Sequence, residues 1–221
     1  MRLRNIPRAE GTIEEHEVAI KNEKQQRGKW QQIFGNEQEI HIEIGMGKGR
    51  FILNMAKAHP EINYIGIERY SSVLLRALEL YDLEEYQNLK NIRFICMDAR
   101  EIADVFLPGE VDRIYLNFSD PWPKARHAKR RLTSLEFLAR YEKVLKPGGY
   151  LEFKTDNKAL FEFSLEEIAQ AKNWEMVSQT FDLHHDEAMC QGNIMTEYEQ
   201  KFSAKGNPIH KVIAVLKNEI K

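Results

Sequence analysis

Acidic residues and glycines follow two apolar runs, and these residue types suit the binding of a nucleoside. Glu43 opens the segment EIGMGKG at positions 43–49, at the end of the apolar run 40–44. The three glycines of this segment permit a tight turn and a close approach of a ligand to the backbone. Glu68 ends the next apolar run, 62–68, where a carboxylate can accept both hydroxyls of a ribose. A purely structural loop is the alternative for the glycines, but the two acids favour a nucleoside-type cofactor.

The spacing of the glycines indicates which cofactor this is. A dinucleotide fingerprint, GxGxxG, would place its third glycine at position 50, where the chain has Arg50. A carboxylate at Glu43 would repel a pyrophosphate, whereas it would attract a cationic amino group or a sulfonium. S-adenosylmethionine carries both of these groups, so it is the predicted cofactor. Asp98, which follows the run 92–97, can accept a hydrogen bond from an adenine amino group, cap the helix expected after it, or do both.

The segment NFSDPWPK at 117–124 is where we expect the chemistry. An Asp-Pro pair commonly begins a turn, and this is the structural explanation of Asp120. That carboxylate also stands at the end of a central strand, beside a tryptophan and next to the glycine segment, where ligands of such sheets bind. Trp122 suits stacking on a base or covering the core. We therefore predict that Asp120 is catalytic.

The basic run KARHAKRR at 124–131 holds five Lys or Arg residues, one histidine and no acid. A solvated surface loop is the ordinary explanation for such a run. Because it continues the segment that carries Asp120, a phosphate backbone held there would bring a base toward that carboxylate. The run therefore predicts contact with nucleic acid, although the formal net charge of the chain is only -2.

Further hydrogen-bond acceptors lie near the ends of later strands. Asp156 belongs to KTDN at 154–157, and Glu197 and Glu199 belong to TEYEQKF at 196–202. Carboxylates suit the N1–H and N2–H₂ donors on the Watson–Crick edge of guanine. Tyr198 can stack on a base or pack into the core. These residues therefore suit the Watson–Crick edge of a guanine.

The composition is that of a soluble globular chain of 221 residues, with 43% hydrophobic and 30% charged residues. Cys96 and Cys190 lie far apart and form no CxxC pair, which suits a reducing compartment. Adjacent histidines, His184 and His185, would point opposite ways in an extended segment, so no metal site is predicted. The chain begins with no apolar signal region and has no run long enough to cross a membrane, so we expect a cytoplasmic protein.

Strand-like and helix-like segments alternate after position 35, which predicts a doubly wound α/β fold with helices on both faces. The expected strands are 40–44, 62–68, 92–97, 111–118, 150–154, 176–181 and 210–216, and the expected helices are 51–59, 71–85, 133–145 and 158–172. No convincing helix separates the last two strands, so an antiparallel, hairpin-like ending is expected on a mostly parallel sheet. Residues 1–35 are expected to form an arm and a helix laid on a single domain, 1–221.

The sequence resembles the bacterial tRNA (guanine-N7-)-methyltransferases, a family of class I methyltransferases. The matching stretches are EIGMGKGRF at 43–51, GIE at 66–68, MDAR at 97–100, NFSDPWPK at 117–124, RHAKRR at 126–131, FKTDN at 153–157 and TEYEQKF at 196–202. The glycine segment is shared by many methyltransferases, whereas DPWPK with its basic run, and TEYEQKF, are far more specific. The resemblance implies a seven-stranded Rossmann-like sheet whose last strand is antiparallel, and a target guanine in the variable loop of tRNA.

The motifs and the resemblance together assign three sets of residues. The cofactor set is Glu43, Gly45, Gly47, Gly49, Glu68, Asp98 and Asp120, of which Asp120 is also catalytic. The substrate set is Lys124, Asp156, Thr196, Glu197, Tyr198 and Glu199. The set that contacts tRNA is Arg126, His127, Ala128, Lys129, Arg130 and Arg131.

The predicted reaction needs no general base, because guanine N7 has an in-plane lone pair and no proton. The task of the enzyme is then alignment and electrostatics, with Asp120 stabilising the positive charge that develops on the purine. Three other hypotheses stay open: a methyltransferase for small molecules or proteins, a non-catalytic RNA-binding module, and a nicotinamide dehydrogenase, which Arg50 and Glu43 disfavour. The chain is expected to be a monomer or a homodimer.

Overall fold

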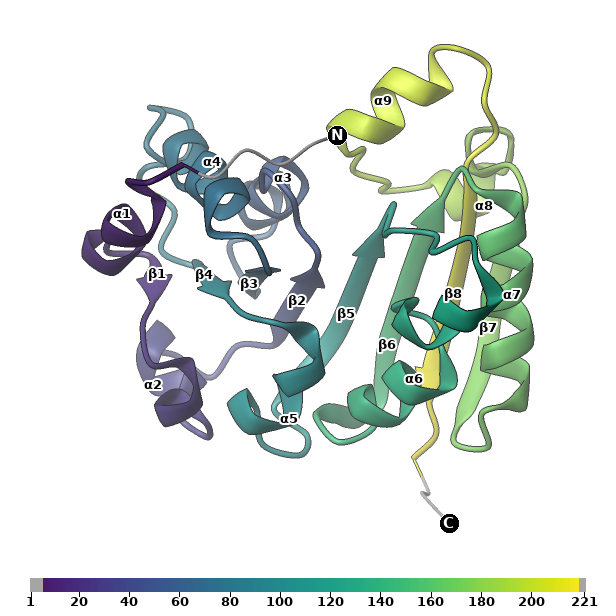
Figure 1. Ribbon diagram of the computed structural model, residues 1–221, viewed down its shortest axis with the longest axis horizontal. Helices are drawn as coiled ribbons and strands as arrows, with labels where there is room; N and C mark the ends of the chain where they lie inside the picture. Colours follow the sequence, from purple (N-terminus) through teal and green to yellow (C-terminus); the bar gives the residue numbers. More distant parts are fainter. Residues whose placement is uncertain (1–5, 219–221) are drawn as a thin grey trace.

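A single mixed sheet runs through the computed structural model, which describes residues 6–218 (Figure 1). Its strands are β1 (Ala19–Ile20), β2 (Ile40–Ile44), β3 (Asn63–Glu68), β4 (Ile92–Cys96), β5 (Val111–Asn117), β6 (Leu145–Thr155), β7 (Trp174–Thr180) and β8 (His210–Leu216). They lie in the order β1-β4-β3-β2-β5-β6-β8-β7. Among the described strands, β8 alone runs in the opposite direction: its pairings with β6 and β7 are antiparallel, and the other pairings are parallel. The predicted doubly wound fold with an antiparallel last strand is confirmed, with β1 as an eighth strand at the edge.

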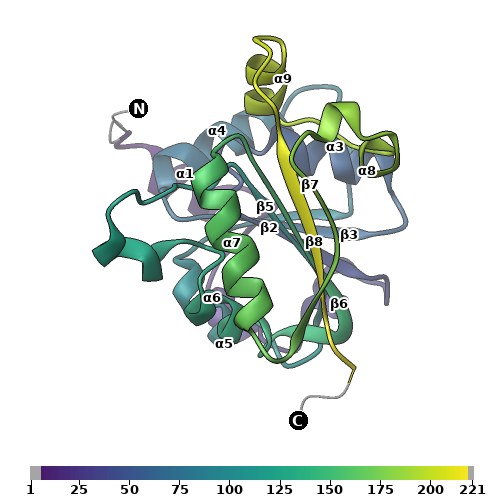
Figure 2. The ribbon, with the colours of Figure 1, turned by 90° about the vertical axis from the view of Figure 1, so that its right-hand side faces the viewer.

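Helices pack on both faces of this sheet (Figure 2). They include α1 (Ala9–Glu15), α2 (Trp30–Phe34), α3 (Arg50–Ala58), α4 (Ser71–Tyr81), α5 (Ile102–Val105), α6 (Leu135–Tyr141) and α7 (Lys158–Gln170). On β4, Phe94 belongs to one buried cluster with residues of α1, α3 and α4, whereas Ile95 belongs to another with residues of α5, α6 and α7. Successive side chains of a strand point to opposite faces, so each cluster is the core of one face.

The amino-terminal residues that were expected to be laid on the domain are built into it. They supply α1, the edge strand β1, the 3₁₀ helix η1 (Glu23–Gln26) and α2. Trp30 is fully buried, stacks on Phe106 with ring centroids 5.1 Å apart, and donates from Nε1 to the carbonyl of Val105 at 3.0 Å. Because a buried indole needs such a partner, α2 is fixed on the side of the sheet that carries α5.

Three short helical segments separate β7 from β8, contrary to the expectation that no helix lies there. They are the 3₁₀ helix η4 (Leu183–His185), α8 (Glu187–Cys190) and α9 (Glu197–Ser203). The helix α9 begins with a capping box, in which Thr196 and Glu199 each bond the backbone N–H of the other. Figure 1 shows α9 above the upper ends of β5 and β6, which are their carboxyl ends.

The helix expected over 133–145 is shorter than predicted and covers only Leu135–Tyr141. Leu145 is the first residue of β6 and pairs with Val111, so the chain has left the helix before the end that was expected for it. Within residues 6–218, no helix has the length and hydropathy needed to span a bilayer.

Candidate active site

The carboxyl ends of β2 and β5 bring Glu43 and Asn117 together. Glu43 is 2% exposed, and its Oε1 accepts a hydrogen bond of 2.8 Å from Nδ2 of Asn117. The other oxygen, Oε2, is buried and has no hydrogen-bond partner. A buried carboxylate oxygen without a partner is costly, so it marks a position that suits a donor or a cation.

Burial raises the pKa of Glu43 to about 8, against an ordinary value of 4.5. The hydrogen bond from Asn117 and the positive charge of Lys154 lower the pKa, but they do not outweigh the desolvation. A cationic ligand against Oε2 would favour the ionised form. The buried carboxylate of Glu43, with Oε2 left without a partner, therefore fits the amino group or sulfonium of S-adenosylmethionine.

Glu68 holds the glycine turn from the end of β3. Its Oε2 accepts from the backbone N–H of Gly47 at 3.1 Å, and its Oε1 accepts from that of Tyr70 at 3.1 Å. Burial raises the pKa of Glu68, these backbone hydrogen bonds oppose the rise, and the nearby charge of Asp120 adds to it. The carboxylate keeps lone pairs for ribose hydroxyls, and Asp120 lies close enough to affect its ionisation.

The glycines of the turn have different tasks. Gly47 has φ 60°, and a Cβ there would meet no atom within 4 Å, so the space beside it is open. Gly49 has φ 78°, and a Cβ there would approach the Cβ of Ala77 to 2.8 Å. Gly47 therefore leaves room for a ligand, whereas Gly49 lets α3 pack closely on α4.

Asp98 has the capping role that its position predicted. Its side chain accepts from the backbone N–H of Arg100 at 3.0 Å and so caps the 3₁₀ helix η2 (Ala99–Glu101). The guanidinium of Arg100 also lies 2.7 Å from the carboxylate, and Arg69 lies 3.5 Å away. These cations lower the pKa of Asp98 and keep it an acceptor.

The turn that follows β5 is strained. Phe118 has φ 52° and Trp122 has φ 41°, a left-handed conformation that bulky residues rarely adopt. Such strain persists only where the surroundings enforce it, and it is concentrated at functional sites. Here the guanidinium of Arg131 donates to the carbonyls of Pro121 at 3.0 Å and Trp122 at 3.1 Å. Asp120 lies exposed on this turn.

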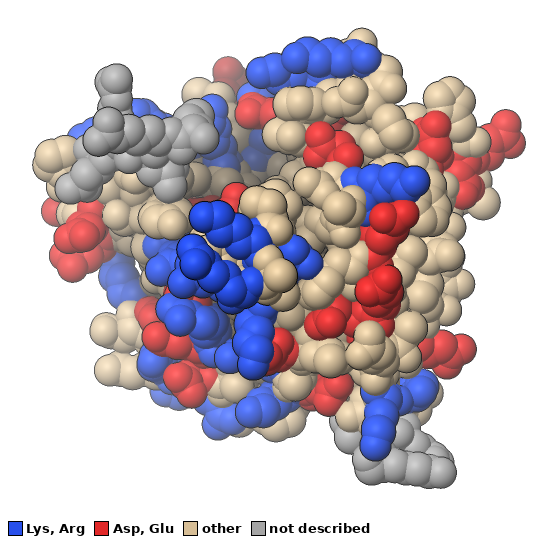
Figure 3. Space-filling model, turned by 45° about the vertical axis from the view of Figure 1, so that its right-hand side comes forward, with Lys and Arg blue, Asp and Glu red and all other residues tan. Residues whose placement is uncertain are grey.

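The basic run forms the 3₁₀ helix η3 (Ala125–Arg130), which continues the strained turn. Arg126, Lys129 and Arg130 are exposed, and Arg130 lies over the ring of Trp122, 4.9 Å from its centroid. In Figure 3, Lys and Arg side chains gather near the middle of the face and acidic side chains lie to the right of them. Arg131 differs from its neighbours, because its guanidinium is used within the protein.

The first turn of α9 meets the ends of β5 and β6. The hydroxyl of Tyr198 donates to Oδ2 of Asp156 at 3.3 Å, and its ring lies 4.8 Å from that of Phe118. Glu197 forms an ion pair of 2.6 Å with Arg50, the residue directly after the glycine segment. The structure thus brings the predicted substrate residues Asp156, Glu197 and Tyr198 to the edge of the sheet that carries Glu43.

Two comparisons with known proteins decide the family. A family model described as "Putative methyltransferase" matches residues 37–212. A tRNA (guanine-N(7)-)-methyltransferase from Lachnoclostridium phytofermentans is 57% identical over 219 residues, which cover 99% of this chain and 100% of that protein. The chain belongs to the tRNA (guanine-N(7)-)-methyltransferase family.

Solved structures similar to this methyltransferase share its fold. A 16S rRNA (adenine(1408)-N(1))-methyltransferase from Catenulisporales acidiphilia has a TM-score of 0.63 at 14% identity, covering 88% of this chain and 94% of that one. The antibiotic-resistance methyltransferase Kmr has a TM-score of 0.61 at 17% identity, with coverages of 88% and 94%. At these identities the likeness concerns the Rossmann-like architecture alone.

Some residues of this methyltransferase's site were not predicted from the sequence. Asn117 holds Glu43, and Lys154 lies buried at the end of β6 with its ammonium 2.7 Å from Glu199. The alternation of side chains along β5 could have indicated Asn117. It lies two residues after Tyr115, the partner of Glu43 in the neighbouring strand, and residues two apart in a strand point to the same face. Nothing in the sequence separates Arg131 from the other cations of its run.

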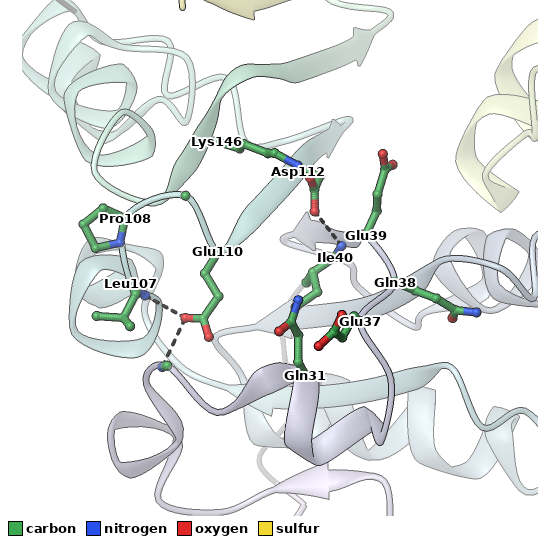
Figure 4. A pocket seen from close by; sticks show the side chains of 12 residues that line it. Gln31, Glu37, Gln38, Glu39, Ile40, Leu107, Pro108, Glu110, Asp112 and Lys146 are labelled. Carbon is green, nitrogen blue, oxygen red and sulfur yellow. Dashed lines mark hydrogen bonds and ion pairs between the residues drawn. The ribbon is translucent and has the colours of Figure 1, made fainter.

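A depression of about 320 Å³ lies elsewhere, beside the amino end of β2 (Figure 4). Three of its four acids already have partners: Glu110 accepts from the backbone N–H groups of Gly28 and Leu107, Asp112 accepts from that of Ile40, and Glu39 lies 3.2 Å from Nε2 of His41. Lys146 also donates to Asp112, at 3.3 Å. These contacts explain the polar lining as structural, so the candidate site remains at the carboxyl ends of the strands.

Proposed function

We propose that this methyltransferase transfers the methyl group of S-adenosylmethionine to N7 of a guanine in tRNA. The observation that carries the proposal is the path of the chain after β5. A strained turn that bears the exposed Asp120 leaves the sheet beside the buried Glu43 and leads directly into the cationic η3. A polyanion held on η3 is thereby adjacent to the cofactor end of the sheet. The name of the relative that is 57% identical supports this function.

The residues of the glycine turn and its neighbours would hold the cofactor. Glu43 offers its unpartnered Oε2 to a cationic group, Glu68 offers acceptors to the ribose, and Asp98 can accept from the adenine amino group. When bound, S-adenosylmethionine supplies an electrophilic methyl group on a sulfonium. The backbone at Gly47 leaves the space that such a ligand requires.

The residues around the target base have to align it and stabilise charge. Guanine N7 carries a lone pair and no proton, so no side chain has to remove one. Positive charge spreads over the purine as the methyl group arrives, and a carboxylate such as Asp120 stabilises that charge more than the neutral base. Arg131 bonds the consecutive carbonyls of Pro121 and Trp122, which follow Asp120, and so keeps Asp120 in place for this role.

The groups that face the base at the edge of the sheet suit guanine. Asp156 can accept from the N1–H and N2–H₂ donors, and Tyr198 and Phe118 offer aromatic surface for stacking. Lys124 would contact the target nucleotide, and the exposed cations of η3 would contact phosphates of the tRNA. The target is a guanine of the tRNA variable loop, and a protein that acts on tRNA is expected in the cytoplasm.

The test uses labelled S-adenosylmethionine and two tRNA transcripts. The first is unmodified, and mapping the labelled nucleotide should identify one guanine in the variable loop. The second carries 7-deazaguanosine at the mapped position, which removes the N7 lone pair and leaves the Watson–Crick edge intact. Label in the second transcript at that nucleotide would disprove N7 as the acceptor. RNA binding without turnover, or transfer only to small molecules or proteins, would support the competing hypotheses instead.

A further inference from the structure

Lys154 is a buried cation whose three hydrogen bonds all go to one segment of the chain, while its ammonium also lies over the ring of Phe51, 5.2 Å from the centroid. Its side chain is 5% exposed, at the carboxyl end of β6. Its ammonium donates to Oε2 of Glu199 at 2.7 Å, to Oδ1 of Asn193 at 3.0 Å and to the carbonyl of Ile194 at 3.1 Å. An ammonium has three N–H donors, so these contacts use all of them. Lys154 therefore ties residues 193–199 to the sheet.

Glu199 has no surface left for a substrate. Its side chain is fully buried, Oε2 is shared by Lys154 and the backbone N–H of Thr196, and Oε1 accepts from Nδ2 of Asn193 at 2.8 Å. Oε1 has a second neighbour, Nε2 of His184, at 3.4 Å. A guanine could reach this carboxylate only if the turn opened and the buried ion pair separated.

The residues just before Glu199 reach the site instead. Glu197 pairs with Arg50 beside the glycine segment, and Tyr198 bonds Asp156 and packs on Phe118. Three consecutive side chains of α9 thus contact the start of α3, the residues that follow β5 and β6, and Lys154 of β6, and the middle one, Tyr198, is 41% exposed. The buried contact of Glu199 with Lys154 sets where the exposed Tyr198 stands.

We infer that Lys154 is a positioning residue for the substrate-binding turn, and that Glu199 acts through Lys154 rather than by touching the guanine. The inference deepens the proposed function and rests on it for the identity of the substrate. A buried pair of this kind tolerates joint replacement far better than the loss of one partner, because a lone partner leaves an uncompensated charge. That asymmetry separates a positioning pair from a substrate ligand.

The experiment compares Lys154→Met, Glu199→Gln and the double variant Lys154→Met/Glu199→Gln with the parent. Glutamine has one acceptor oxygen in place of two, so Glu199→Gln removes the charge together with one of the two hydrogen bonds that the carboxylate accepts from Thr196 and Asn193. Lys146→Met is the matched control, since Lys146 lies on the same strand at its other end, is exposed and pairs with Asp112. Turnover is measured at saturating S-adenosylmethionine, so that a change in cofactor affinity does not enter the comparison.

Each single variant should raise the KM for tRNA and lower kcat/KM by roughly 10–100-fold, the loss typical of a displaced positioning group. The double variant should recover at least part of that loss, and Lys146→Met should behave like the parent. A double variant as poor as both single losses combined would show that Glu199 binds the guanine itself, and it would overturn the inference.

Amide hydrogen exchange tests the same assignment without any substrate. Residues 193–203 should exchange faster in Lys154→Met and regain protection in the double variant. Exchange in Lys154→Met that equals that of the parent would overturn the inference. Because this measurement needs no tRNA, it decides the positioning role even if the parent fails to methylate tRNA, which would count against the proposed function alone.

Discussion

Arg131 holds Trp122 in its left-handed conformation: Nη2 of the guanidinium donates to the Trp122 carbonyl at 3.1 Å, while Nε bonds the preceding carbonyl. The same guanidinium lies 4.2 Å from the centroid of the Phe163 ring, on α7. The last residue of the basic run therefore joins the strained turn to a helix of the core. It belongs to the scaffold of Asp120, although Lys129 and Arg130 just before it are exposed.

Arg131→Lys should slow methyl transfer without changing how tRNA binding responds to salt. Lysine keeps the charge but lacks the planar fork that bonds both carbonyls. We expect the single-turnover rate to fall by roughly 10–100-fold, because a small displacement of a reacting group is costly. A shallower salt dependence of tRNA affinity in this variant would instead make Arg131 a phosphate ligand.

The combined change Arg126→Ala, Lys129→Ala and Arg130→Ala should do the opposite: it should change how tRNA binding responds to salt and leave the rate of methyl transfer on bound tRNA unchanged. These side chains are exposed, and the ion pair of Lys129 with Glu136 joins groups that are 83% and 38% exposed, so stability should change little. Each phosphate that the variant no longer neutralises should make the log–log salt slope of tRNA binding shallower by roughly 0.7–0.9. An unchanged slope with unchanged affinity would show that η3 is only a solvated surface.

Asp120→Ala should fold normally and lose most of its turnover. The side chain is exposed on the turn, so little packing is removed. Removing one preorganised electrostatic group typically costs roughly 10²–10³-fold in rate. Single-turnover assays with saturating cofactor and tRNA measure this loss, and a rate near that of the parent would remove Asp120 from the mechanism.

Cofactor affinity should depend on pH through Glu43, whose pKa is about 8. At pH 6 the carboxyl of the free protein is protonated, whereas a bound cation favours the carboxylate, so binding releases a proton. The affinity for S-adenosylmethionine should then rise by up to about tenfold per pH unit from pH 6 to pH 8. Titration calorimetry of the parent and of Glu43→Gln measures it. The ligand's own amino group titrates in both proteins, so equal pH profiles would exclude Glu43.

Glu43 should also make the stability of the free protein fall as the pH rises. Its folded-state pKa is raised from 4.5 to about 8, so its stabilising contribution is complete below pH 4.5 and is lost by about pH 8. In that window the parent should lose about 1.4 kcal/mol per pH unit relative to Glu43→Gln. Urea denaturation of both proteins at several pH values measures the difference. Parallel stability curves would contradict the shift.

The sequence predicted where the strands of the site end, because each is a short run rich in β-branched and aromatic residues that is followed closely by glycines or ends at or near a polar residue. Glu43, Glu68 and Asp98 could be placed at one edge of the sheet by that rule alone. The strand β1 could not be predicted, since two residues carry no periodicity. The helix α9 could have been, because TEYE matches the S/T-x-x-E pattern of a capping box.

The contacts that hold the substrate residues could not be predicted from the sequence, for a physical reason. Lys154 and Glu199 meet across 45 positions, and no local pattern links them. A charged residue at the end of a strand is equally typical of a ligand and of a buried pair. Arg131 likewise looks the same as Arg130 in the sequence, and only the three-dimensional path of the turn separates their roles.

The position of β8 between β6 and β7 has a consequence for the newborn protein. During synthesis, β6 and β7 leave the ribosome with open edges that have no partner until residues 210–216 follow. The segment that carries α9 is joined to β8, so its final position is also reached only then. A chain still under translation can hold much of the cofactor half of the sheet, yet it cannot present a finished surface to tRNA. Competence therefore arrives in one late step, when the last strand is inserted.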